Sequence, residues 1–328
     1  MSEPRVHFLN VGQGDCFLIE RTSNRLTMID ICCGNLVTDE KKEIIKESAF
    51  SKPSGNYGMC KKPTNPIDYL TNHGISTIWR FILTHPDMDH MDGIKKLFDN
   101  KTVNNFWDCG IRREKPDFKN NYQYLEEDWD YYDSIINGSV STVKVISPRA
   151  GDKGVFWNRD DEQGNGDGDY LSIISPNDEL IKQANDNGDI NDASYVIVYR
   201  SSGGNIIFPG DSNDKTWEYI LDKHKALVSD AAVLFAPHHG RKSDRDYSFL
   251  DVVNPRISFF GCASSDDLAY SAWNNRGLLY FTNNQCGNVH VYPKDKTVKV
   301  FIENQKYAED FTDKNTYQLN GYWFLCEV

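Results

Sequence analysis

The sequence lacks three features that would each have assigned it to a class of protein. Its eight cysteines contain no C-x-x-C pair, which argues against a zinc knuckle and a thioredoxin-like motif. No stretch approaches the run of about 18 apolar residues that a membrane span needs. Residues 1–5 lead directly into a predicted strand and do not resemble a signal peptide. We therefore expect a cytoplasmic protein without a membrane partner.

Positive charge is also in short supply. The chain has 36 lysines and arginines against 48 aspartates and glutamates, for a net charge of −12. Such a surface does not attract nucleic acid over long distances, so a polyanionic substrate would depend on a local basic patch and on bound metal. The adjacent Cys32 and Cys33 are expected to be buried and reduced.

The order of predicted elements favours one layered α/β domain over residues 1–328. Apolar strands alternate with helices, polar residues gather at strand ends, and no internal repeat is visible. Residues 39–66 are predicted to begin a helix and continue as a surface loop. The less regular segment at about 105–168 is predicted to be an insertion that could bind a protein partner. Residues 277–328 are predicted to form a β-rich tail.

The densest group of potential metal ligands follows one predicted strand. Residues 78–83 form an apolar run, and residues 93–98 begin a predicted helix. The turn between them carries two imidazoles and two carboxylates, those of His85, Asp87, Asp89 and His90. Such a set can hold one or two divalent cations, and a bound cation generates hydroxide at neutral pH.

Two later strand ends carry the same kind of side chain. One predicted strand ends at Gly210-Asp211, and another delivers the pair His238-His239. Open α/β sheets build their sites at the carboxyl ends of strands. The sequence therefore predicts that these residues meet the His85–His90 turn.

These motifs resemble the metallo-β-lactamase superfamily. Residues 85–90 are similar to its His-x-His-x-Asp-His signature, with Asp87 at the second histidine. The resemblance is closer to the hydrolase domain of the bacterial competence protein ComEC and its stand-alone relatives, through residues 8–16 (F-L-N-V-G-Q-G-D-C), 191–194 (N-D-A-S) and 237–240 (P-H-H-G). It implies an αββα sandwich of two mixed β-sheets flanked by helices.

The resemblance also implies roles for single residues. Asp30 would orient the metal site from behind its ligands, and Asp211 would bridge two metals. Because no histidine lies between His90 and His224, the superfamily's third histidine is missing; Asp192 could replace it or could organise the surroundings with Ser194. The implied ligands are His85, Asp87, Asp89, His90, Asp211, His239 and Asp192, with His238 as the alternative to His239.

The implied cofactor is a pair of divalent metal ions. Aspartate in place of histidine makes the site richer in oxygen, which moves the expected metal from zinc towards manganese or magnesium while zinc stays possible. His238, His239, Asp89 and Asp30 are the predicted catalytic residues, and the histidine that does not bind metal could protonate the leaving group. Arg241 and Lys242, with Ser194, are the predicted substrate-binding residues, because positive charge beside the site suits a phosphate.

The predicted activity is hydrolysis of a phosphodiester, with DNA, RNA or a small nucleotide as substrate. Two alternatives remain open at this point. One is a hydrolase of a small ester that is not a nucleic acid. The other is a catalytically inactive protein of the same fold that binds a partner, since the departures from the signature could have disabled catalysis.

Overall fold

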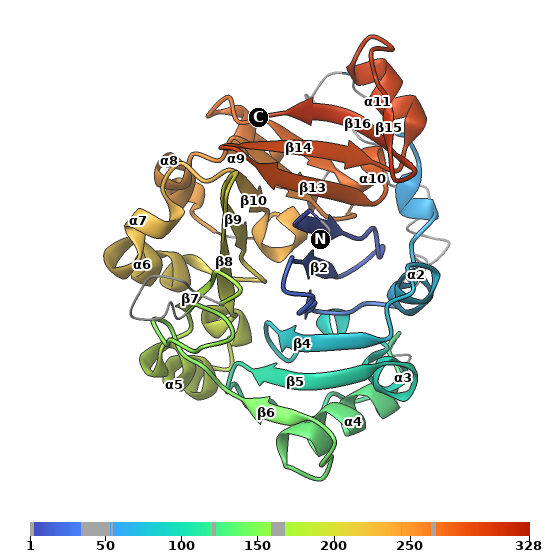
Figure 1. The fold of residues 1–328 in the computed structure, drawn as a ribbon. Coiled ribbons are helices and arrows are strands. Elements are labelled where there is room, and N and C mark those ends of the chain that lie inside the picture. The colour runs from blue at the N-terminus through green and yellow to red at the C-terminus, as the bar shows by residue number, and fades with distance from the viewer. Residues whose placement is uncertain are drawn as a thin grey trace.

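The structure is a computed structural model that describes residues 3–33, 53, 55–119, 123–158, 168–243, 245–263 and 267–328. Most of the segment 39–66, predicted as a helix start and a loop, lies outside these residues. Strands of the described chain form two sheets (Figure 1). The larger sheet contains, in spatial order, β15 (Gln318–Leu319), β16 (Tyr322–Glu327), β14 (Thr297–Ile302), β13 (Val289–Lys294), β1 (Arg5–Phe8), β2 (Phe17–Glu20), β3 (Thr27–Ile29), β4 (Thr77–Leu83), β5 (Thr102–Asp108) and β6 (Lys144–Ile146).

Both sheets mix parallel and antiparallel pairing. In the larger sheet β3 to β6 run parallel, whereas β1 pairs antiparallel with both β2 and β13. The smaller sheet contains, in order, β12 (Tyr280–Thr282), β11 (Ile257–Phe260), β10 (Val233–Phe235), β9 (Gly204–Phe208), β8 (Val196–Ser201) and β7 (Leu171–Ser175). Its strands β9 to β12 are parallel, and β7, β8 and β9 are antiparallel.

The core between the sheets follows from the alternation of side chains along each strand. Phe8 and Phe17 point inward from the larger sheet and meet Phe235 of the smaller sheet, with ring centroids 5.2 and 4.6 Å apart. Burying each such ring contributes about 1.5–3 kcal/mol. Strand β4 is buried on both faces, and its one charged member, Arg80, is compensated by Asp169 at 3.1 Å.

Helices cover the outer faces. On the side of the larger sheet lie α2 (Pro66–Asn72), α3 (Ile94–Asn100) and α4 (Glu126–Ile136), which share a second apolar cluster with its strands. On the opposite side of the molecule lie α5 (Asp178–Asn187), α6 (Asp214–Lys223), α7 (Lys225–Val228) and α8 (Leu250–Val253) (Figure 1). The short α9 (Tyr270–Asn274), α10 (Asn283–Cys286) and α11 (Gln305–Phe311) complete the described α-helices. The predicted αββα sandwich is therefore confirmed.

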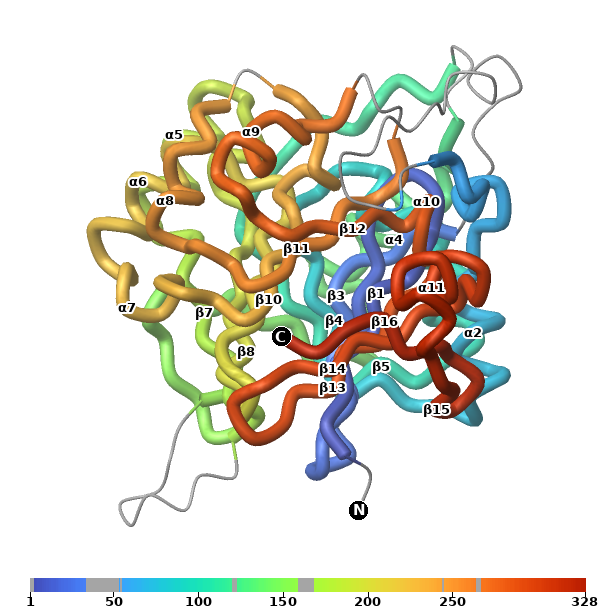
Figure 2. The backbone as a smooth tube through the Cα atoms, turned by 90° about the horizontal axis from the view of Figure 1, so that it is seen from above, coloured from blue at the N-terminus to red at the C-terminus, as the bar shows by residue number. Residues whose placement is uncertain are grey.

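The segment 105–168 contributes to this framework. Most of β5, all of α4 and all of β6 come from it, and β6 pairs parallel with β5 to extend the larger sheet. The β-rich stretch at 277–328 supplies β12 to the smaller sheet and β13, β14 and β16 to the larger one; Figure 2 shows these last three strands side by side near the C-terminus.

Six cysteines of the chain take no part in a disulfide, and two are joined. Cys32 and Cys33 are both outside disulfides; Cys32 is buried as expected, whereas Cys33 is only half-buried. Cys60 and Cys262, which the sequence gave no reason to pair, form a disulfide across a separation of 202 residues. No helix among the described residues is long and apolar enough to cross a membrane.

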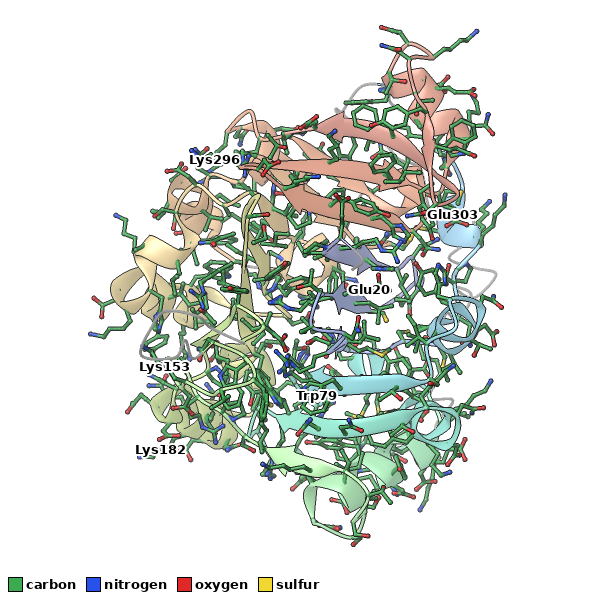
Figure 3. All side chains as sticks on the ribbon, in the orientation of Figure 1. Glu20, Trp79, Lys153, Lys182, Lys296 and Glu303 are labelled. Carbon is green, nitrogen blue, oxygen red and sulfur yellow. A yellow bond between two sulfur atoms is a disulfide. The ribbon has the colours of Figure 1, made fainter. Side chains whose placement is uncertain are left out.

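Two histidines outside the motifs form a buried polar network far from the strand ends that carry the motifs. The Tyr69 hydroxyl lies 2.7 Å from His7 Nδ1 and 2.8 Å from His290 Nε2. Glu20 of β2, labelled near the middle of the molecule in Figure 3, approaches His7 Nε2 at 3.5 Å. These contacts hold both rings against Tyr69 of α2, and they leave His7 Nε2 and His290 Nδ1 without a hydrogen-bond partner.

Candidate metal centre

The candidate metal centre lies where parallel strands of both sheets end. Strand β3 leads to Asp30, and its parallel neighbour β4 leads to Thr84 and His85. In the smaller sheet, β9 leads to Asp211, and its parallel neighbour β10 leads to the turn that carries His239. Because the carboxyl ends of parallel neighbours share one edge, the two facing sheets bring these side chains together.

Nitrogen and oxygen atoms converge on the Asp211 carboxylate. His90 Nε2 lies 3.3 Å from it, His239 Nε2 3.7 Å and His85 Nε2 3.8 Å. Asp89 Oδ2 approaches His239 Nε2 at 3.4 Å. Three groups of residues present ligand atoms within 4.8 Å of one another: His85, His90 and Asp211; Asp89, His90 and His239; and Asp15, Asp211 and His239.

The Asp30 carboxylate fixes the orientation of two of these histidines. It accepts the Thr84 amide at 2.8 Å, the Thr84 hydroxyl at 2.7 Å and His90 Nδ1 at 2.8 Å. Since the hydroxyl proton goes to Asp30, Thr84 Oγ1 is left to accept from His85 Nδ1 at 3.1 Å. In the neutral form of each ring the proton therefore sits on Nδ1 and the Nε2 lone pair faces Asp211. Burial opposes further protonation of His90, yet Asp211, Asp30 and Asp89 raise its pKa well above the usual value, so the metal-free ring also holds a proton on Nε2.

Protonation states in the metal-free cluster are set by burial and by mutual attraction. Burial would raise the pKa of the Asp211 carboxyl, but the imidazoles of His239, His90 and His238 hold it well below its usual value. Burial opposes protonation of His239, yet Asp15 and Asp211 raise its pKa to about 10. The metal-free cluster thus holds protons on imidazoles that a divalent cation would displace.

A second pair of histidines responds mainly to burial. Burial, reinforced by the neighbouring His90, lowers the pKa of His85 to about 4. Burial likewise lowers the pKa of His238 to about 4, against the attraction of Asp211. The neutral imidazole is the form in which histidine binds metal.

The residues present fit a bound metal. Five atoms of the cluster are buried without a hydrogen-bond partner. Four of them face one another, His85 Nε2, His90 Nε2, His239 Nε2 and Asp211 Oδ1, and the fifth, His239 Nδ1, faces Asp15. Buried polar atoms in folded proteins are nearly always hydrogen bonded, so four unpartnered atoms aimed at one place indicate a missing ligand. Imidazole nitrogen with carboxylate oxygen is a donor set suited to zinc and manganese.

Asp15 joins the cluster, and sequence reasoning missed it. Its Oδ1 lies 3.1 Å from His239 Nδ1, and its side chain is buried. The available signal was its place in the motif of residues 8–16, which supported the family resemblance but was given no role in the site. A carboxylate behind a metal-binding histidine fixes the ring and its tautomer.

Two arginines that sequence reasoning also missed border the cluster. Arg245 contacts His238 Nδ1 at 2.7 Å and donates to the carbonyl oxygens of Asp211 and Ser212. Arg113 comes from the segment predicted as an insertion and donates to Asp87 Oδ1 at 2.7 Å. Neither arginine belongs to a recognisable motif, so only the folded chain shows their proximity.

Asp87 and Asp192, two of the predicted ligands, are not among the converging groups of the described residues. Asp87 caps the short helix at residues 88–90 through the amide of Met88 and is held by Arg113. Asp192 is buried and forms an ion pair with Lys215 at 2.9 Å. In this structure the Asp87 carboxylate pairs with Arg113 and the Asp192 carboxylate pairs with Lys215. Nitrogen atoms therefore make up a larger share of the potential metal ligands than the sequence suggested.

The predicted substrate-binding residues lie around the same turn. Arg241 directly follows the short helix of residues 237–240 and forms an isolated β-bridge with Leu268. The amide of Lys242 donates to the Asp267 carbonyl oxygen. Ser194 is fully buried beneath Gly210, which favours a packing role for its side chain over contact with a substrate.

Gly14 is a position at which the site should be sensitive to a single methyl group. Its φ is +88°, and a Cβ there would lie 2.0 Å from the Asp89 carbonyl oxygen and 2.9 Å from Cys32 Cβ. Gly14→Ala should therefore displace Asp89 and lower the free energy of unfolding by about 2–4 kcal/mol. Urea denaturation measures the loss, and metal titration reports the displacement.

Gly138 provides the matched control. Its φ is +81°, but a Cβ there would meet nothing within 4 Å. Gly138→Ala should lose only the backbone contribution, about 1–2 kcal/mol, and leave metal binding unchanged. Equal losses for the two variants would show that the contact with Asp89 does not matter.

Comparisons with known proteins agree with the motifs. No protein-family model matches the chain. ComE operon protein 3 of Bacillus subtilis is 20% identical over 265 residues, which are 81% of this chain. The chain spans 29% of the length of that relative.

Solved structures with similar folds include two proteins of matching size. A metallo hydrolase from the archaeon Ignicoccus hospitalis is 13% identical, with a TM-score of 0.44 over 85% of this chain and 94% of that one. The metallo-β-lactamase fold protein YhfI from Bacillus subtilis is 11% identical, with a TM-score of 0.43 over 85% of this chain and 96% of that one. The two mixed sheets, the helices on their outer faces and the site at the strand ends are those of the metallo-β-lactamase fold, and ComE operon protein 3 is a distant relative of this chain.

Proposed function

We propose that the protein is a metal-dependent hydrolase that cleaves phosphodiesters. The observation that carries the proposal is the convergence of the buried, unpartnered atoms of His85, His90, His239 and Asp211. Such a group is costly to keep in a folded protein without a ligand, because each buried polar atom without a partner costs about 1–3 kcal/mol.

The residues divide into two overlapping sets of ligands. His85, His90 and Asp211 form one set, and Asp89, His90 and His239 form the other. Divalent cations bound there would supply hydroxide at neutral pH and neutralise the charge on substrate oxygens. Asp30, hydrogen bonded to His90, and Asp15, 3.1 Å from His239 Nδ1, would orient these two rings for binding the cations.

Positive side chains beside the cluster favour a phosphodiester over an uncharged ester. Arg245 contacts His238, Arg241 follows the turn that carries both histidines, and Arg113 pairs with Asp87 in the turn between His85 and His90. The chain as a whole, by contrast, carries a charge of −12. Guanidinium groups bind phosphate oxygens through paired hydrogen bonds. The resemblance to the ComEC hydrolase domain supports DNA, RNA or a small nucleotide as the substrate.

The proposal predicts metal-dependent cleavage. After treatment with a chelator, the protein should not hydrolyse bis(4-nitrophenyl) phosphate or a fluorescent single-stranded oligonucleotide, and Mn²⁺, Zn²⁺ or Mg²⁺ should restore turnover. Metal bound per chain, measured by plasma mass spectrometry, should reach at least about one equivalent, since the site offers two ligand sets. Bound metal should also raise the melting temperature, because it binds only the folded chain.

Asp222→Asn is the matched control for every aspartate variant of the site. Asp222 lies on α6 with a side chain that is 69% exposed, and it is not part of the cluster. Its replacement should leave turnover and metal content unchanged. A protein that binds no metal and cleaves no phosphodiester with any of the three ions would contradict the proposed function.

A further inference from the structure

His238 and His239 are neighbours in sequence, but their rings meet different partners. Both residues have a left-handed backbone, with φ of 54° and 57°. Their ring centroids are 5.8 Å apart and their planes are inclined by 60°. His239 is buried, whereas the side chain of His238 is 26% exposed. Left-handed residues other than glycine are strained and cluster at functional sites. We therefore asked whether the two histidines of this turn have different functions.

The three buried histidines of the cluster each have an oxygen beside Nδ1. His85 Nδ1 is hydrogen bonded to the Thr84 hydroxyl and His90 Nδ1 to Asp30, whereas His239 Nδ1 lies 3.1 Å from Asp15 Oδ1 without hydrogen-bond geometry. Histidine binds metal as the neutral imidazole, which has one proton, so in that form an acceptor at Nδ1 leaves Nε2 with a lone pair. All three Nε2 atoms are buried without a hydrogen-bond partner and are available to metal.

His238 is the exception, because its Nδ1 meets a donor. Arg245 Nη1 lies 2.7 Å from that nitrogen. A guanidinium has only donors and stays protonated, so Nδ1 of His238 must accept and its single proton must sit on Nε2. The guanidinium is held in place by its bonds to the Asp211 and Ser212 carbonyl oxygens and to the Ser243 hydroxyl.

This arrangement excludes two roles for His238. A protonated Nε2 has no lone pair for a metal, which leaves His239 as the ligand of the pair. A proton cannot be added at Nδ1 while Arg245 donates to it, so the ring does not become the imidazolium that a proton donor to the leaving group would need. What remains is a fixed N–H bond at the edge of the cluster, with Nε2 3.5 Å from Asp211 Oδ2.

We propose that His238 is a neutral hydrogen-bond donor to a phosphoryl oxygen of the substrate, positioned by Arg245, and that it neither binds metal nor transfers a proton. This inference rests on the proposed hydrolase activity. A preorganised neutral donor stabilises charge that develops on oxygen in the transition state. The partial exposure of His238 gives the substrate access that the three buried histidines do not have.

Three variants separate the possible roles. His238→Gln keeps an N–H donor at a similar reach, His238→Ala removes it, and His239→Gln removes a proposed ligand. We expect His238→Gln and His238→Ala to bind as much Mn²⁺ as the unmodified protein, measured by calorimetry, and His239→Gln to bind less. On bis(4-nitrophenyl) phosphate, His238→Ala should lose about 10²–10³-fold in kcat, and His238→Gln should recover most of that loss.

The outcomes that overturn the inference are specific. Loss of Mn²⁺ from His238→Gln would make His238 a ligand. A loss of kcat in His238→Gln as large as in His238→Ala, growing as the leaving group becomes more basic, would make it a proton donor. Equal kcat in all forms of residue 238 would exclude any contact with the substrate.

Nuclear magnetic resonance of ¹⁵N-histidine in the metal-free protein tests the tautomer without any activity. His238 should show a protonated Nε2 and an unprotonated Nδ1, assigned by the signals that disappear in His238→Ala. Arg245→Lys should preserve this pattern, and Arg245→Met should mix the tautomers. A proton on Nδ1 in the unmodified protein would overturn the inference even if the protein is a hydrolase. The expected tautomer in a protein that cleaves no phosphodiester would instead contradict the proposed function.

Discussion

Asp211→Asn is expected to lower the rate of phosphodiester cleavage at least about 10³-fold while leaving the fold intact. Asp211 is the carboxylate on which the cluster converges, since four histidine Nε2 atoms lie between 3.3 and 3.8 Å from it. An asparagine keeps the shape of the side chain but removes its charge, so metal binding should weaken together with catalysis. No other described side chain contacts as many histidines of the cluster.

The measurement compares turnover, bound metal and circular dichroism for Asp211→Asn and for Asp222→Asn. Unchanged spectra with lost metal and lost turnover in the Asp211 variant alone would support the ligand assignment. Full turnover in Asp211→Asn would show that the reacting groups lie elsewhere. The low pKa of the Asp211 carboxyl, which the surrounding imidazoles depress against the effect of burial, means that its charge is present throughout the range in which activity would be assayed.

Sequence reasoning located the strand ends well because each motif is contiguous with an apolar run. The strand predicted at 78–83 is observed as Thr77–Leu83, and the helix predicted from residue 93 begins at Ile94. The strands that lead to Asp30 and His239 are short, at Thr27–Ile29 and Val233–Phe235, and Asp30 itself has a left-handed backbone with φ of 57°. The periodicity of apolar residues indicates which residues are buried. It does not indicate at which residue the backbone hydrogen bonds of a strand end.

The partners of the site residues were harder to predict. Asp87 was assigned to metal because its motif position suggested a ligand, and no sequence pattern shows that Arg113, 26 residues later, would hold it. Asp192 was likewise assigned without knowledge of Lys215 on α6. Ion pairs between loops depend on tertiary packing, so residue type and spacing alone could name the candidates but could not choose among them.

The same limit applies to contacts at greater separation. Cys60 and Cys262 are 202 residues apart, and nothing in their spacing predicts a bond between them. The segment 105–168 was predicted to be an insertion because its pattern is less regular, and that pattern did not reveal the part of β5, the helix α4 and the strand β6 that it contains. In both cases a residue or strand that is distant in the sequence determines the contact, namely Cys262 for Cys60 and β5 for β6.

Asp30→Ala should have the largest effect on stability. The Asp30 side chain is fully buried and accepts from the Thr84 amide, the Thr84 hydroxyl and His90 Nδ1. Alanine would leave these three donors buried without an acceptor, which should lower the free energy of unfolding by about 3–5 kcal/mol. Urea denaturation of the metal-free protein measures the loss independently of catalysis.

Asp230→Ala controls for the backbone, because Asp230 shares the left-handed conformation of Asp30, with φ of 51° against 57°, but is exposed. It should lose about 1–2 kcal/mol at most. Asp30→Asn separates the charge from the packing: its amide N–H groups would face His90 Nδ1, favour the opposite tautomer and place a proton on the Nε2 that should bind metal. We therefore expect Asp30→Asn to be folded but to bind metal poorly. A folded Asp30→Asn protein with undiminished metal affinity would contradict this expectation. It would mean that His90 binds metal without the help of the Asp30 carboxylate, and that this carboxylate only stabilises the fold.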